Sequence, residues 1–281
     1  MIEFEFTIIY IYAAIIGLCV GSFINVVITR LPEKGKFLSK TRSECPSCNK
    51  TIKPYDLIPV ISWVILFGKC RFCKARIPLR YPAVELLGAI SSIASLLKYR
   101  FYYYTDSTVI SFEHEQYIHV HHFDFNFAAV ILFGVFMILL AVSIIDFNTS
   151  EIPDSLVIAL IPFAIAAIWL LPDITLLSHI IGIFTVSVPM LLLSLVIPGA
   201  FGGGDIKLMF VCGFLLGWQL TLLAFFVALL LGGSTALFLL ATKRRKKGQH
   251  MVFGPSLCAG VVTSLFLGNY ILDWYLGFLI L

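Results

Sequence analysis

Two aspartates, Asp146 and Asp205, lie at the edges of long apolar segments and are the residues best suited to chemistry. Asp146 follows the apolar run 127–145, and Asp205 follows the three glycines at 202–204. A carboxylate close to hydrocarbon is costly, so each is by default a functional candidate. Asp205 could instead only cap the helix that follows it, because Asp is a preferred N-cap residue.

A pair of carboxylates at one depth in a membrane protein predicts acid–base chemistry. The two cannot both ionise cheaply next to a low-dielectric phase, so we expect them to share one proton. In an aspartic protease the anion takes a proton from water, while the protonated partner hydrogen-bonds the scissile carbonyl. Proton or ion transport is the alternative use of such a pair.

The neighbouring sequence predicts different roles for three aspartates. Asp154 follows Pro153 and precedes an apolar run, which is typical of a helix N-cap. Asp205 is predicted at a helix start, where backbone N–H groups and the dipole favour an anion, and Lys207 would act in the same direction. Asp146 is predicted at a helix end without such donors. We therefore expect Asp146 to carry the shared proton and Asp205 to be the base.

Four cysteines form two Cys-x-x-Cys pairs, Cys45 with Cys48 and Cys70 with Cys73. Their spacing predicts a tetrahedral structural zinc site. A redox role is the alternative, because the same spacing can lower a thiol pKa. The polar segment around them has little core of its own, so a metal would supply much of its folding energy.

The elements that carry these residues are predicted to be membrane helices. Of the 281 residues, 59% are hydrophobic and only 13% charged, whereas soluble domains carry about 25% charged residues. Apolar runs long enough to span a bilayer recur along the chain, which predicts an all-α polytopic membrane protein with about eight transmembrane helices. The run 206–240 fits two short spans with a turn at 217–219. We divide the chain into a first helix at 1–29, a cytoplasmic zinc domain at 30–80 and a membrane domain at 81–281.

The basic residues predict the orientation of the chain. Twelve of the 20 Lys and Arg lie between residues 30 and 80, and five more form the run 243–247. By the positive-inside rule both stretches face the cytoplasm, which places the amino terminus outside. Eight spans then bring Asp146 and Asp205 to the same cytoplasmic face. The same placement accounts for the net charge of +4 without a nucleic-acid partner.

Two other polar features are interpreted structurally. The segment 98–125 is predicted to be a polar, aromatic loop, although its four histidines, His114, His119, His121 and His122, could bind a metal. Asn25, near the end of the first apolar run, is predicted to hydrogen-bond between helices. Substrate contact is the alternative for Asn25.

Several motifs, in order along the chain, resemble those of the bacterial type IV prepilin peptidases, also called leader peptidase/N-methyltransferases. The segment 21–32 is similar to the first-helix motif of that family, and the cysteine pairs followed by 80–85 (Arg-Tyr-Pro-Ala-Val-Glu) resemble its cytoplasmic domain. Asp146 with 152–154 (Ile-Pro-Asp) is similar to its first catalytic segment. The run 202–205 matches the Gly-x-Gly-Asp signature of intramembrane aspartic proteases.

The resemblance implies a multi-pass enzyme of the bacterial cytoplasmic (inner) membrane, in contact with membrane lipid. Such an enzyme would cleave the basic leader of type IV prepilins or type II secretion pseudopilins after a Gly, on the cytoplasmic side. Asp146 and Asp205 would be its catalytic pair. It would then methylate the new amino terminus, usually Phe, with S-adenosylmethionine. The residues that bind this donor are not assigned from the sequence.

Three alternatives remain open at this point. The first is a peptidase without methyltransferase activity, in which the zinc domain only docks prepilin. The second is an Asp-dependent transporter, which would need a continuous polar path through the bilayer. The third is a non-enzymatic scaffold of a secretion machine, which a cleavage assay would distinguish from an enzyme.

Overall fold

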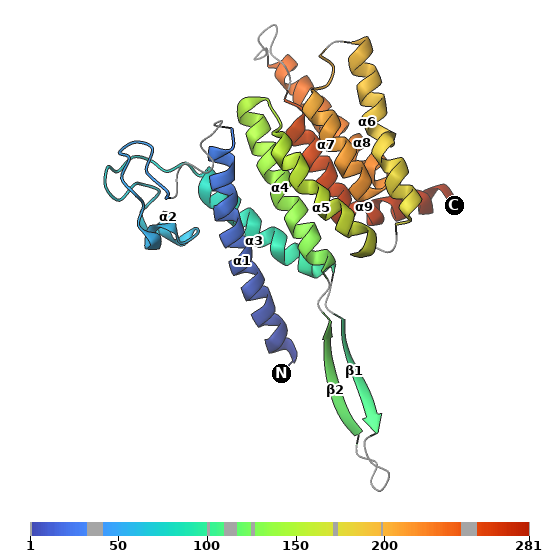
Figure 1. The fold of residues 1–281 in the computed structure, drawn as a ribbon, viewed down its shortest axis with the longest axis horizontal. Helices are drawn as coiled ribbons and strands as arrows, with labels where there is room; N and C mark the ends of the chain where they lie inside the picture. The colour runs from blue at the N-terminus through green and yellow to red at the C-terminus, as the bar shows by residue number, and fades with distance from the viewer. Residues whose placement is uncertain are drawn as a thin grey trace.

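The computed structural model describes residues 2–32, 42–99, 102–109, 117–124, 127–170, 174–197, 199–242 and 252–280. Its elements in chain order are α1 (Ile2–Arg30), the 3-10 helix η1 (Pro54–Leu57), α2 (Ile61–Ile65), α3 (Arg80–Lys98), β1 (Tyr102–Val109), β2 (Tyr117–Asp124), α4 (Ala128–Thr149), α5 (Asp154–Leu170), α6 (Leu176–Val196), α7 (Gly203–Leu216), α8 (Trp218–Ala241) and α9 (Gly254–Ile280). Figure 1 shows the long helices packed as a bundle. A small unit that contains η1 and α2 (residues 42–79, called the α2 unit below) lies beside one end of α1 and α3.

Five helices of the described chain are long and apolar enough to cross a membrane: α1, α4, α6, α8 and α9. The apolar helix α5 is shorter, and α7, with 14 residues, extends only about 21 Å at 1.5 Å per residue. Helix α3 carries Arg80, Glu85 and Lys98 among its 19 residues. The described ranges thus contain eight helices of 14 residues or more, of which five are long and apolar enough to cross a membrane, whereas about eight transmembrane helices were predicted. The prediction of a helical, multi-pass membrane protein is confirmed.

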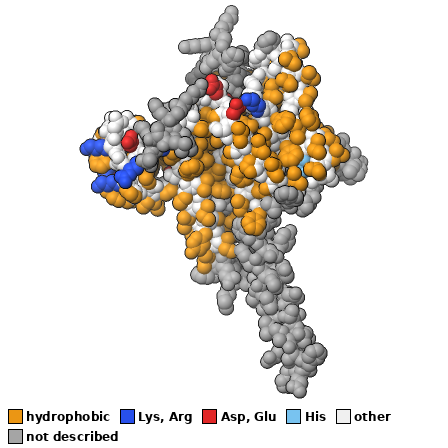
Figure 2. All heavy atoms as spheres, in the orientation of Figure 1, with side chains coloured by type: hydrophobic (Ala, Val, Ile, Leu, Met, Phe, Trp, Pro, Cys, Tyr) orange, Lys and Arg blue, Asp and Glu red, His pale blue; other side chains and the backbone are white. Residues whose placement is uncertain are grey.

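The central helix of the bundle is α4. Its residues Val135, Leu139, Ala141 and Val142 have no exposed surface, and it packs against α1, α3, α5 and α9. A helix that is apolar on all sides is typical of such a buried position. Figure 2 shows hydrophobic side chains over much of the described surface on the side in view, as expected where lipid replaces water.

Small residues bring neighbouring helices into backbone contact. A side chain at Gly88 of α3 would collide with the carbonyl of Gly17 in α1, and one at Gly213 of α7 would collide with the carbonyl of Gly182 in α6. Close backbone approach of this kind is a common way of packing helices in membranes, where the hydrophobic effect does not drive association. The contact holds the short α7 firmly against the longer α6.

The predicted turn between the two short spans is confirmed. Helix α7 ends at Leu216 and α8 begins at Trp218. Gly217 between them has a φ of +74°, and a side chain there would also meet Ile174 and Ser178 at the start of α6. Glycine adopts positive φ readily, which permits so tight a connection.

The prediction of a loop at 98–125 is wrong for the described part of that segment. Strands β1 and β2 form an antiparallel hairpin, paired from Tyr102 with Asp124 to Val109 with Tyr117. Its strands are rich in Tyr, Thr, Val and Ile, which favour extended structure. In Figure 1 the hairpin projects from the end of the bundle that is far from the α2 unit. His114 lies outside the described residues, as does the basic run 243–247.

Candidate active site and cysteine cluster

Asp146 lies in the last turn of α4 and is 6% exposed. Its Oδ2 accepts a hydrogen bond of 3.1 Å from the backbone N–H of Gly254, the first residue of α9. The expectation that Asp146 lacks such a donor is therefore wrong. A hydrogen bond to a charged group contributes about 1.5–3 kcal/mol, so this donor favours the anionic form.

Asp205 lies in the first turn of α7 and is 8% exposed. Its Oδ2 accepts a hydrogen bond of 3.2 Å from the N–H of Gly202 at the start of that helix. The N-cap role considered for Asp205 is therefore not observed, because Gly202 holds the N-cap position and Asp205 lies three residues further on, inside the helix. Gly204, its neighbour, lies so close to Ile152 of the α4–α5 connection that an added Cβ would be 2.9 Å from the Ile152 Cβ. The glycine therefore lets α7 approach the chain that follows Asp146.

The structure brings Asp146 and Asp205 together at one end of the bundle. Asp146 lies close enough to Asp205 for its charge to act on the Asp205 carboxylate. The segments that support them also touch, because the rings of Phe201, just before α7, and Phe253, just before α9, lie 5.6 Å apart. Two buried carboxylates on different helices, each held by one N–H donor, can activate water and polarise a carbonyl between them.

Gly254 could not be recognised from the sequence as a partner of the pair. The predicted cytoplasmic placement of the run 243–247 already put the start of the next helix at the same face as Asp146. The topology therefore contained the signal, although no local pattern links two residues so far apart. Cys258, one turn further along α9, is 3% exposed and packs in the hydrophobic core.

Asp154 has a structural contact, but it is not the N-cap that was predicted. Helix α5 begins at Asp154 itself, and the carbonyl of Pro153 accepts the first helical hydrogen bonds. The Asp154 side chain is 64% exposed and forms an ion pair of 2.8 Å with Lys207, which is 58% exposed. Lys207 therefore pairs with Asp154 rather than reaching back to Asp205.

The four cysteines converge in the α2 unit. Their Sγ atoms all lie within 4.8 Å of one another, and those of Cys45 and Cys73 are 3.8 Å apart. A tetrahedron with Zn–S bonds of about 2.3 Å has an S–S edge of about 3.8 Å. The described thiols therefore fit one tetrahedral metal ion, and four sulfur donors are the chemistry that zinc prefers.

The two cysteine pairs have the same local backbone. In each, the residue after the second cysteine, Asn49 or Lys74, has positive φ and donates its N–H to the carbonyl of the first cysteine, Cys45 or Cys70. The N–H groups of Cys73 and Phe72 lower the pKa of Cys70 to about 6. A thiolate is the form that binds metal, so the turn prepares Cys70 as a ligand.

One buried polar residue joins this unit to the helices, and another joins the two helices beside it. Glu85 of α3, 8% exposed, accepts a hydrogen bond of 2.7 Å from the N–H of Val60 at the start of α2. Asn25 of α1, 2% exposed, donates from Nδ2 to the carbonyl of Tyr81 in α3 at 3.0 Å. The predicted interhelical hydrogen bond of Asn25 is confirmed. The contact of Glu85 therefore holds the α2 unit against α3, and that of Asn25 holds α1 against α3.

Comparison with known proteins places the chain in a family. Residues 131–237 match the sequence profile described as "Type IV leader peptidase family", and residues 15–99 match "Bacterial Peptidase A24 N-terminal domain". A "Prepilin leader peptidase/N-methyltransferase" of Bacillus subtilis is 30% identical over 262 residues, which cover 93% of this chain and 96% of the relative. The chain belongs to the type IV leader peptidase family.

Proteins of the same name in other bacteria show similar matches. The one from Vibrio cholerae is 31% identical over 74% of this chain and 79% of its own length. The one from Pseudomonas aeruginosa is 29% identical over 94% of this chain and 92% of its own length. No solved structure matches the chain. The residues that match the peptidase profile include both Asp146 and Asp205. The residues that match the N-terminal profile include all four clustered cysteines.

Proposed function

We propose that this chain is a prepilin peptidase and N-methyltransferase. It would cleave type IV prepilins or type II secretion pseudopilins and then methylate the new amino terminus. The observation that carries the proposal is a pair of buried carboxylates on two different helices, Asp146 and Asp205, which each accept a backbone N–H at one end of the bundle. The family membership supports the substrate class, and the printed name of the relatives supports the methylation.

In the proposed cleavage, Asp146 and Asp205 share one proton. The anionic member takes a proton from water, whose oxygen adds to the scissile carbonyl carbon, while the protonated member hydrogen-bonds the carbonyl oxygen. The tetrahedral species then collapses, the C–N bond breaks, and the leaving amine takes up the proton that the first carboxylate removed from water. Each carboxylate accepts one backbone N–H, so the pair does not need fixed acid and base roles.

For the second reaction, S-adenosylmethionine would supply a methyl group bound to a cationic sulfur. The neutral amine of the new terminus forms the N–C bond, and the C–S bond breaks with its electron pair left on sulfur. Zinc would be held by Cys45, Cys48, Cys70 and Cys73 and would stabilise the fold of the unit without entering either reaction.

The test of function uses purified protein, a synthetic prepilin peptide and S-adenosylmethionine, with mass spectrometry of the products. Wild type should release the leader and add one methyl group to the new terminus. Asp146→Asn and Asp205→Asn should each remove cleavage, because an amide can neither ionise nor share the proton. Cleavage that persists in both variants would contradict the catalytic pair, and an uncut peptide with wild type would favour a scaffold or transporter.

We also propose that the chain lies in the bacterial inner membrane, in contact with lipid, with its amino terminus outside. The division into 1–29, 30–80 and 81–281 stays a prediction. Charge bias supports the orientation, because the Lys-rich and Arg-rich α2 unit should face the cytoplasm. In intact cells an impermeant thiol reagent should label Ser107→Cys in β1 and should miss Thr51→Cys in the α2 unit. The reverse labelling would invert the topology.

A further inference from the structure

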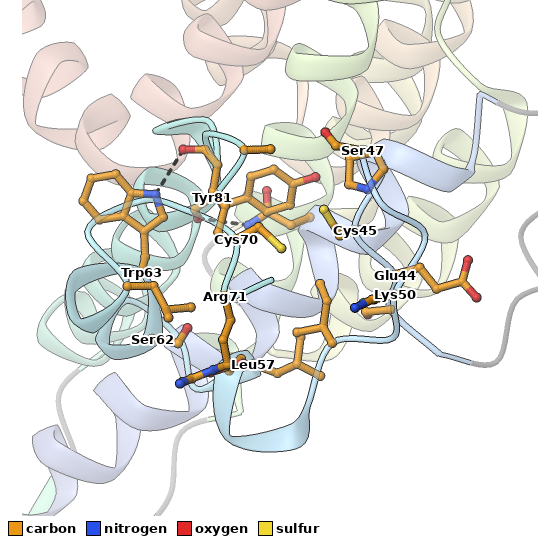
Figure 3. Close-up of a pocket in the computed structure, with 18 of the residues that line it drawn as sticks. Glu44, Cys45, Ser47, Lys50, Leu57, Ser62, Trp63, Cys70, Arg71 and Tyr81 are labelled. Atoms are coloured by element: carbon orange, nitrogen blue, oxygen red, sulfur yellow. Dashed lines mark hydrogen bonds and ion pairs between the residues drawn. The ribbon is translucent and has the colours of Figure 1, made fainter. Parts of the chain in front are cut away.

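A cavity of about 540 Å³ lies where the α2 unit meets α1 and α3. Small-molecule sites in proteins typically have volumes of about 300–1,000 Å³. Its lining comes from three parts of the chain: Asn25 in α1, Tyr81 and Glu85 in α3, and residues of the α2 unit such as Trp63. Figure 3 shows Trp63 and Tyr81 on one side of this cavity, with Cys70 between them and Cys45. The cleavage reaction proposed above for Asp146 and Asp205 does not use this cavity.

Asn25 leaves a buried acceptor in the cavity wall. Its Nδ2 is bonded to the Tyr81 carbonyl, but its Oδ1 is buried and has no hydrogen-bond partner among the described residues. A buried polar atom without a partner costs about 1–3 kcal/mol. The N–H of a ligand in the cavity would satisfy it.

Glu85 places a buried carboxylate in the same wall, about one turn of α3 beyond Tyr81. Its described partners are neutral: the N–H of Val60 at 2.7 Å and the hydroxyl of Ser22. A buried carboxylate is stabilised further by a positive charge nearby. A ligand with a cationic group therefore suits this part of the cavity.

The part of the lining that belongs to the α2 unit offers the other charge. Arg42, Lys50 and Arg76 line the cavity, and Asp56 there is paired with Arg71 through contacts of 2.6 and 2.8 Å. With aromatic side chains also present, the cavity suits a ligand that has an aromatic ring and charges of both signs. The basic leader of a prepilin suits it less well, because the cationic side chains in the lining outnumber the carboxylates.

We propose that this cavity binds S-adenosylmethionine, an inference that rests on the methyltransferase function proposed above. Glu85 would face the cationic part of the donor, the free Oδ1 of Asn25 would accept one of its N–H groups, and the basic wall would face its carboxylate. Helices α1 and α3 both pack on α4, whose last turn carries Asp146. The donor would thus lie at the same end of the bundle as the cleaved terminus (Figure 1).

The first test measures equilibrium binding of radiolabelled S-adenosylmethionine to purified, zinc-loaded protein in detergent. Asn25→Leu removes the free acceptor, and Ser62→Trp fills the cavity from α2. Each should weaken binding at least about tenfold, which is what the loss of one buried hydrogen bond to a ligand is worth. Ser95→Ala is the matched control, because Ser95 is a buried polar residue of α3 outside the cavity. Binding by both cavity variants at the wild-type affinity would overturn the proposal.

The second test uses wild type only and so does not depend on how the variants fold. Ultraviolet cross-linking of bound S-adenosylmethionine, followed by peptide mapping, should place the label within residues 42–99, which include Trp63 and Tyr81. Label confined to residues 128–280 would overturn the site but leave the methyltransferase function intact. Wild type that neither binds the donor nor methylates the cleaved peptide would instead refute that function, and the site with it.

Discussion

Replacing Gly254 with Ala should impair cleavage strongly while leaving the protein folded. A methyl group at this position would lie 2.9 Å from Cγ of Asp146 and closer still to Oδ2, so the carboxylate must move and its hydrogen bond to the Gly254 N–H is lost. A hydrogen bond to a charged group is worth about 1.5–3 kcal/mol, which corresponds to about 10- to 150-fold in rate. A displacement of about 1 Å at a catalytic group costs about 100-fold. We therefore expect kcat to fall about 100-fold.

The assay is steady-state cleavage of a prepilin peptide, with the melting temperature in detergent measured in parallel. Stability should change little, because Ala favours a helix by up to about 1 kcal/mol over Gly and this gain offsets part of the lost contact. Gly203→Ala in the first turn of α7 is the matched control, since an added Cβ there meets nothing within 4 Å. The reasoning is refuted if Gly254→Ala cleaves within threefold of wild type, or if Gly203→Ala loses as much activity.

The remaining predictions concern the ion pair, the metal and the glycine before Asp205. Asp154→Asn and Lys207→Met should keep most of the cleavage activity and change stability by less than about 1 kcal/mol, because exposed ion pairs contribute little; loss of activity as complete as in Asp205→Asn would give Asp154 a catalytic role. Elemental analysis should find one zinc per chain, and a metal-free wild type would contradict this. Cys73→Ser should lose the zinc, and it should speed proteolysis of the α2 unit more than it slows cleavage of the prepilin peptide. Gly204→Ala should overpack against Ile152 at a cost of about 1–3 kcal/mol and lower both the melting temperature and the cleavage rate. Gly203→Ala, where an added Cβ meets nothing within 4 Å, should change neither, and equal losses in the two variants would show that the contact with Ile152 is not the cause.

The features that the sequence predicted are those set by strong local rules. Hydropathy and length fix where helices cross a membrane, so the bundle and the turn at Gly217 could be predicted. Ligand spacing fixed the cysteine cluster, because Cys-x-x-Cys pairs position two thiols on one turn. The span count also placed Asp146 and Asp205 at one end, although it could not give their partners.

The features that could not be predicted depend on contacts between distant segments or on competing propensities. Lys207 was expected near Asp205, two residues away, but Asp154 of another helix offers it a more exposed partner. The hairpin of β1 and β2 has aromatic and β-branched residues that favour strands, but its charged residues and histidines are equally typical of a loop. The cavity between the α2 unit and α3 is formed by tertiary packing, and no sequence motif predicts it.

The carboxylate pair shows how tertiary structure changes an argument based on helix dipoles. From its own helix, Asp146 stands at a negative end and should hold the proton, whereas Asp205 stands at a positive end and should be the anion. In the bundle, however, the start of α9 meets Asp146, so each carboxylate accepts one N–H from a residue at the start of a helix, Gly254 or Gly202. The dipole of α9 offsets that of α4 at this point. The difference between the two sites is therefore smaller than the sequence suggests. A nearly symmetric pair that shares one proton fits a reaction in which one carboxylate acts first as base and then as acid, while its partner acts in the opposite order.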